Sequence, residues 1–244
     1  MRMMLLLVAM AGFPWLLRAE DAAPQTNAVE NRRVAPVLLL ATDRGDFILA
    51  GNSVSSVDGP QRWIRKVDRN GQSFFYKTLP SPEQDEITAG GAAADGGALM
   101  AGTRFVYQPR AKYRAWLERC NRLCGSEFLH VLKDDGRPAV LFQALDQSCY
   151  VGGAALAVEV EGALYDGWLV KLSPEGEEVW TRRYDHGADE MIVGGFATAD
   201  EGCVLALTST LAEKMGRGPA DVWLEKCAAD GAVLRRVKLG RCRI

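Results

Sequence analysis

Short runs of alternating apolar and polar residues, separated by Gly, Asp, Asn or Pro, fill most of the chain after residue 33. This alternation is typical of half-buried β-strands. Beyond the first 33 residues, no segment of useful length places its apolar residues at the 3.6-residue period of an α-helix. The pattern therefore predicts an all-β protein built from hairpins.

One hairpin pattern occurs four times. Each copy opens with Trp, an aliphatic residue, a variable residue, a basic residue and an apolar one, and then continues through a turn into a second strand. The tryptophans follow one another at intervals of 52 to 55 residues, as Trp63, Trp116, Trp168 and Trp223. Two further strand-like runs precede each hairpin at the same period. Four strands in a repeat of about 52 residues are typical of a β-propeller blade. The predicted repeats span 34–79, 86–133, 138–184 and 190–240.

The hairpin turns have a recognisable chemistry. DRNG, SPEG and AADG each end in Gly, which suits a type I turn closed by a left-handed residue. We expect the turn of the second copy to be one residue longer, because Cys124 precedes Gly125 there.

The third copy, DGWLVKLSPEGEEVW at residues 166–180, resembles a family of bacterial, often exported, β-propeller repeats with a D-x-W-L-V-K-L-x-x-x-G-x-x-x-W hairpin. The resemblance covers about residues 34–240 and implies a propeller scaffold, which is used for many functions. Four blades could form a closed ring or a half-propeller that pairs with a second copy as a homodimer. The closed ring is the favoured expectation.

The N-terminus has the features of an export signal. A short basic start, Met1-Arg2, precedes an apolar run over 3–17, which predicts a signal peptide over 1–19 and a flexible leader over 20–33. An uncleaved anchor is the alternative, and no later run is long enough to span a membrane. Export predicts a periplasmic or extracellular location, where disulfides persist. Cys120 and Cys124 could form a disulfide across the turn, or remain as one buried and one exposed thiol.

Composition and motifs exclude several functions. A net charge of −2 gives no general attraction to nucleic acid. No nucleophile elbow, zinc-protease, P-loop or dinucleotide motif is present, so we predict no catalytic residue, cofactor or metal. The acid pairs at 85–86 and 189–190 could bind a cation such as Ca²⁺, although loop solubility is the preferred explanation. His130 is expected in the core, and His186 is the only plausible general base.

The predicted binding site is the loop TRFVYQPRAKYRAW of the second repeat, on one rim of the propeller. It interleaves aromatic and basic side chains that can hold sugars, carboxylates or a protein surface. The proposed ligand-binding residues are Arg104, Tyr107, Arg110, Lys112, Tyr113 and Arg114. The expected function is a non-catalytic binding or scaffold module that engages a protein or glycan. The alternatives are a small hydrolase or lyase using rim carboxylates and His186, or an accessory subunit of an exported complex.

Overall fold

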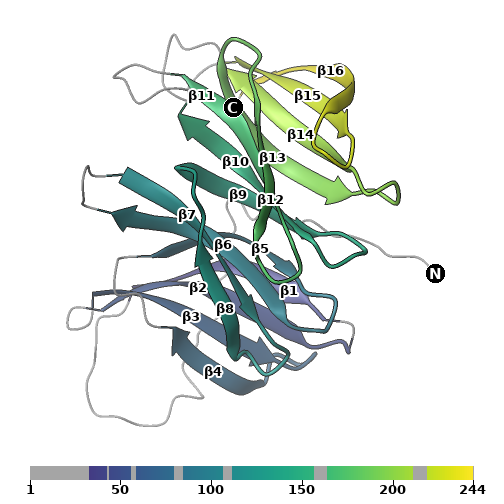
Figure 1. Ribbon diagram of the computed structural model, residues 1–244. Coiled ribbons are helices and arrows are strands. Elements are labelled where there is room, and N and C mark those ends of the chain that lie inside the picture. The colour runs from purple at the N-terminus through teal and green to yellow at the C-terminus, as the bar shows by residue number, and fades with distance from the viewer. Residues whose placement is uncertain are drawn as a thin grey trace.

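The protein is all-β and consists of four four-stranded antiparallel sheets of about 52 residues each, consistent with propeller blades (Figure 1). The computed structural model describes residues 33–42, 44–55, 59–79, 85–106, 112–156, 164–210 and 219–243. The predicted signal peptide and all of the leader except Arg33 lie outside these residues. Within the described ranges, no helix is long and apolar enough to cross a membrane.

Each sheet contains four consecutive strands in chain order. Sheet 1 holds β1 (Arg33–Ala41), β2 (Phe47–Ser55), β3 (Gly59–Val67) and β4 (Ser73–Leu79). Sheet 2 holds β5 (Glu86–Ala92), β6 (Ala98–Val106), β7 (Lys112–Cys120) and β8 (Ser126–Val131). Sheet 3 holds β9 (Gly136–Gln143), β10 (Cys149–Leu156), β11 (Tyr165–Leu172) and β12 (Glu178–Tyr184). Sheet 4 holds β13 (Asp189–Ala197), β14 (Cys203–Thr210), β15 (Pro219–Cys227) and β16 (Val233–Arg243). The predicted repeats therefore coincide with the sheets to within a few residues.

The sheets form an open array. The first strands of successive sheets are in contact, β1 with β5, β5 with β9 and β9 with β13. No comparable contact joins β13 back to β1 within the described ranges, and sheets 1 and 4 lie at opposite ends of the array in Figure 1. The favoured expectation of a closed four-bladed ring is thus not met by the described part of the chain, because each sheet packs only on its sequence neighbours.

The repeated hairpin residues build the contacts between sheets. Trp116 is fully buried in one cluster with Ile64, so it packs on the preceding sheet. Trp168 packs in the same way with Leu117 of sheet 2. The aliphatic residue after each Trp points to the other face because side chains alternate along a strand. Each fully buried side chain of this size contributes about 1.5–3 kcal/mol to stability.

Small residues on the first strands accommodate large ones from the preceding sheet. A Cβ on Gly90 would lie 2.2 Å from Cδ1 of Leu38, and one on Gly195 would lie 2.6 Å from Cε1 of Phe142. Large side chains of sheets 1 and 3 therefore pack on glycines of sheets 2 and 4. Leu38 and not its neighbour Leu39 is the packing residue of sheet 1, because Leu39 is 57% exposed.

The hairpin turns have the predicted left-handed residue. Gly71, Gly176 and Gly231 have φ angles of 81°, 89° and 82°. In sheet 2 the same position belongs to Cys124, with φ of 58°, and its amide donates to the carbonyl of Asn121 as the glycine amides do in the other turns. The prediction of a longer second turn was wrong, since Cys124 takes the place of Gly.

Candidate functional site

Most of the predicted binding loop is a continuation of two strands. Strand β6 runs to Val106 and β7 starts at Lys112, so Arg104, Lys112, Tyr113 and Arg114 lie in strands. Cross-strand pairing joins Arg104 to Arg114 and keeps the antiparallel ladder intact to its end. Their placement in a loop was therefore incorrect. Tyr107 and Arg110 lie outside the described residues.

Arg104 belongs to a buried ion-pair network between sheets 1 and 2. Its Nε and Nη2 atoms donate to the two carboxylate oxygens of Asp85 at 2.7 and 2.8 Å. Arg62 from sheet 1 lies 3.8 Å from the same carboxylate and also pairs with Glu118. The side chains of Arg62, Asp85 and Glu118 are at most 3% exposed. Arg104 is therefore committed to a structural contact rather than to an external ligand.

Tyr113 belongs to a surface that reaches from sheet 2 to sheet 3. The guanidinium of Arg137, at the start of β9, lies 5.2 Å from the ring centre of Tyr113 and 5.4 Å from that of Tyr165, at the start of β11. Tyr113 is 44% exposed and Arg137 is also exposed. We call these three residues the Tyr–Arg–Tyr surface. It lies on the connection rim, the end of the array that carries the β6–β7 and β10–β11 connections and the links between sheets.

The sequence did not indicate Arg137 or Tyr165, because each is a single residue at the start of a strand with no motif around it. Arg114, at the same rim, has its Nε 3.8 Å from a carboxylate oxygen of Asp135 and a side chain that is 40% exposed. The structure thus brings the predicted Tyr113 together with Arg137 and Tyr165, which were not predicted.

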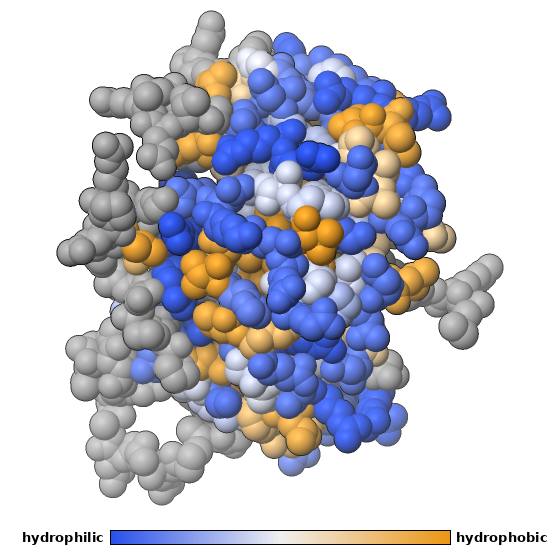
Figure 2. Space-filling model, viewed as in Figure 1, coloured by the Kyte–Doolittle hydropathy of each residue, from blue (hydrophilic) through white to orange (hydrophobic). Residues whose placement is uncertain are grey.

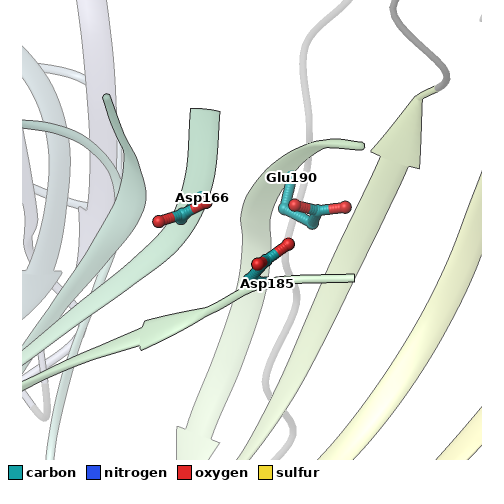
Figure 3. A group of neighbouring side chains, drawn as sticks. All are labelled: Asp166, Asp185 and Glu190. Carbon is teal, nitrogen blue, oxygen red and sulfur yellow. The ribbon is translucent and has the colours of Figure 1, made fainter. Parts of the chain in front are cut away.

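A second group on this rim contains three carboxylates. Asp166 is on β11, Asp185 follows β12 and Glu190 is on β13 (Figure 3). Their ligand oxygens all lie within 4.8 Å of one another. Burial raises the pKa of Glu190, and burial followed by repulsion from Asp185 raises that of Asp166. The group therefore concentrates negative charge between sheets 3 and 4.

The two histidines lie in different environments. His130 is exposed, so its assignment to the core was wrong: its ring lies 5.0 Å from that of Phe128, beside Gly176 of the β11–β12 turn in sheet 3. The His186 side chain is only 5% exposed, with Nε2 2.9 Å from a carboxylate oxygen of the buried Glu225. Its ring packs edge-on against Trp223. His186 thus lies inside the contact between sheets 3 and 4 rather than facing a substrate at the rim.

The opposite end of the array has a hollow of about 330 Å³ between the turns of sheets 1 and 2. Two of its charged side chains are paired with each other: Lys66 lies 3.6 Å from a carboxylate oxygen of Asp46 and also donates to the carbonyl of Arg122.

Cys120 and Cys124 are both buried and both free thiols in the structure. The alternative that assumed an exposed Cys124 was wrong, because its side chain points into the core between sheets 1 and 2. Burial raises the pKa of Cys120 to about 12, which suppresses formation of the reactive thiolate. A disulfide between the two residues stays a prediction.

No family model matches the chain, and no curated protein matches it. Among solved structures, the chain is similar to a protein of unknown function from Bacteroides caccae. The two are 13% identical, the match covers 84% of this chain and 82% of the other, and the TM-score is 0.35. At this level of similarity the match assigns neither a family nor a function.

Proposed function

We propose that the protein is a non-catalytic binding module that engages a protein or glycan through its connection rim. The Tyr–Arg–Tyr surface supports this proposal, because two phenol rings and a guanidinium form an amphipathic, pre-organised contact area. Aromatic faces stack on sugar rings or apolar side chains, and the guanidinium pairs with carboxylates. Membership in the exported propeller family, with a location in the periplasm or outside the cell, is part of the proposal.

The test is a binding screen with an array of neutral and carboxylate-bearing oligosaccharides, together with photo-crosslinking of protein partners. Arg137→Ala and Tyr113→Ala should each weaken binding of whatever the wild type captures at least tenfold, because hot-spot residues of these types typically contribute more than about 1.4 kcal/mol. Leu145→Ala is the control, because Leu145 is 90% exposed and lies in a turn at the opposite rim. Binding that persists in both rim variants would contradict the proposal.

The free faces of the two terminal sheets support a second role, which is assembly. Within the chain, Ile64, Leu117 and Leu169 are fully buried beneath the next sheet. The corresponding residue of sheet 4, Leu224, is only partly buried, and Phe196 on the same face is 52% exposed. Figure 2 shows apolar side chains gathered at the sheet 4 end of the molecule. The face that packs on the next sheet in sheets 1, 2 and 3 is thus partly exposed in sheet 4.

The other terminal face has a complementary character. Leu39, Leu49, Arg65 and Tyr76 form one cross-strand row on the side of sheet 1 that faces away from sheet 2. Leu39 is 57% and Tyr76 54% exposed. We infer that a second copy of the chain covers both faces, with its sheet 1 on this sheet 4 and its sheet 4 on this sheet 1. A twofold axis makes both contacts at once and closes the ring.

Light scattering coupled to gel filtration tests this assembly. The wild type should have twice the mass of one chain, and Leu39→Glu should reduce it to one chain by placing a charge within the contact. Leu145→Glu adds the same charge at an exposed turn and should leave the mass unchanged. A wild type that remains a single chain over the whole concentration range would refute the role in assembly, without bearing on the rim.

A further inference from the structure

Asp85 and Glu190 occupy equivalent positions in sheets 2 and 4. Asp85 lies two residues before the buried Ile87, and Glu190 lies two residues before the buried Ile192. Each isoleucine pairs with a residue of the second strand of its sheet, and that residue pairs in turn with the repeat Trp on the third strand. Both carboxylate residues are 1% exposed.

The two carboxylates differ in what surrounds them. Asp85 is neutralised by Arg104 from its own sheet and by Arg62 from the preceding sheet. In sheet 4 the position of Arg104 is occupied by Ser209, which pairs with Glu190. The position of Arg62, just before the Trp of the preceding sheet, is occupied by Gly167. Neither can supply a positive charge. The carboxylate in sheet 2 is thus held by two guanidinium groups, whereas the equivalent carboxylate in sheet 4 has neither of them.

Among the described residues, further carboxylates and not cations lie beside Glu190. Asp166 is 9% exposed and Asp185 approaches from the link between sheets 3 and 4 (Figure 3). The Arg183 guanidinium lies 3.9 Å from a carboxylate oxygen of Asp166, and its side chain is 36% exposed. Asp185 is exposed, whereas Asp166 and Glu190 are buried, and one peripheral arginine does not balance these two buried carboxylates.

One oxygen of Glu190 is left without a partner. Its Oε1 accepts hydrogen bonds from Ser209 Oγ and from the Ala188 amide, each at 3.0 Å. Its buried Oε2 has no hydrogen-bond partner among the described residues, and the carboxylate lies beside the two aspartates in Figure 3. Asp185 Oδ1 accepts from the Gly187 amide at 2.7 Å, which fixes that side chain as well. A buried unpaired carboxylate oxygen in a native protein calls for an explanation, and a bound water or ion is one.

We propose that Asp166, Asp185 and Glu190 bind a Ca²⁺ ion between sheets 3 and 4. Ca²⁺ takes six to eight oxygen ligands at about 2.3–2.6 Å in flexible geometry, so one ion can contact oxygens that lie within 4.8 Å of one another. Water completes the remaining coordination. The set contains no nitrogen or sulfur ligand of the kind that favours zinc. The bound ion ties β11 and β13 to the link between the two sheets.

Calorimetric titration of the metal-free full chain with Ca²⁺ tests the site. Thermal unfolding with and without Ca²⁺ is a second, independent measurement of binding. We expect Ca²⁺ to bind the wild type and raise its melting temperature, and EDTA to reverse the shift. Glu190→Gln and Asp166→Asn should each weaken Ca²⁺ binding at least tenfold, because affinity depends on ligand charge. Without Ca²⁺ both variants should be at least as stable as the wild type, since they remove mutually repelling buried charge.

Glu86→Gln is the matched control, because Glu86 is an exposed carboxylate at the start of the equivalent strand in sheet 2. It should retain the wild-type response to Ca²⁺. Titration with Mg²⁺ should give weaker binding, since Mg²⁺ requires a smaller and more regular shell. The proposal is overturned if Ca²⁺ neither binds nor stabilises the wild type, or if the Glu190 and Asp166 variants respond to Ca²⁺ as the wild type does.

Discussion

Neutralising Asp85 should destabilise the contact between sheets 1 and 2. The substitution Asp85→Asn keeps the size of the side chain but removes the charge that Arg104 and Arg62 share. The Arg62 side chain is 3% exposed, and its guanidinium lies 4.5 Å from the ring centre of Trp116. A positive charge at this depth cannot exchange its lost partner for bulk water.

The magnitude follows from the burial of the partners. Removing one member of a buried ion pair typically costs about 3–5 kcal/mol. Arg62 retains Glu118, and the Arg104 side chain is 16% exposed, so both are partly compensated. We therefore expect the lower end, a decrease of about 3 kcal/mol in the free energy of unfolding. With a slope of about 3 kcal/mol per molar urea, this corresponds to a shift of about 1 M in the unfolding midpoint.

Urea unfolding followed by tryptophan fluorescence measures the effect, since Trp116 lies in the affected contact. Glu86→Gln changes the exposed next residue, at the start of β5, and should alter the free energy of unfolding by no more than about 0.5 kcal/mol. If Asp85→Asn loses less than about 1 kcal/mol, the arginines find alternative partners or water. The argument that the network holds these sheets together by paired charge would then be wrong.

Three further predictions concern packing, pH and thiol chemistry. Gly102→Ala should cost at least about 3 kcal/mol by urea unfolding, because the new Cβ would lie 2.6 Å from Cζ2 of Trp116 and still closer to a carbonyl oxygen; a near-neutral result would mean that the strand shifts freely. Hydrogen bonding to Arg241 lowers the pKa of Asp221 to about 2, below its ordinary value of 3.8. The stability from this pair is thus present above pH 4 and decreases as the pH falls toward 2. Asp221→Asn should therefore melt below the wild type at pH 7, and a difference as large at pH 2 as at pH 7 would refute this. In the native protein a thiol reagent should label Cys242 alone, since the other five cysteines are buried, and a bond between Cys120 and Cys124 would appear as two thiols that resist labelling after unfolding without reductant.

Much of the fold could be predicted because the same pattern occurs in four copies that can be compared with one another. Trp63, Trp116, Trp168 and Trp223 recur with the same neighbours, so each copy supports the strand assignment of the others. The errors arose where one copy departs from the rest. Cys124 in a glycine position suggested a longer turn, although the hydrogen bond to Asn121 keeps the turn length unchanged.

The candidate site was predicted less well, because its parts come from different sheets. Tyr113 was identified from its aromatic and basic neighbours along the chain, but its actual partner, Arg137, is on another sheet. Arg104 has the same local composition as Tyr113, yet a buried carboxylate from the preceding inter-sheet link holds it. Local sequence does not record which neighbouring strand supplies the partner of a charged side chain.

The sequence by itself determined the strands, their order and the division into four sheets, because alternation and turn chemistry act over a few residues and recur at a fixed period. The tertiary structure alone decided which carboxylates are neutralised. Asp85 and Glu190 are equivalent in the sheets, but two arginines meet the first, whereas two aspartates approach the second. That difference arises from residues of adjacent sheets brought together by packing, and it turns one repeat position into a structural ion pair and the other into the proposed Ca²⁺ site.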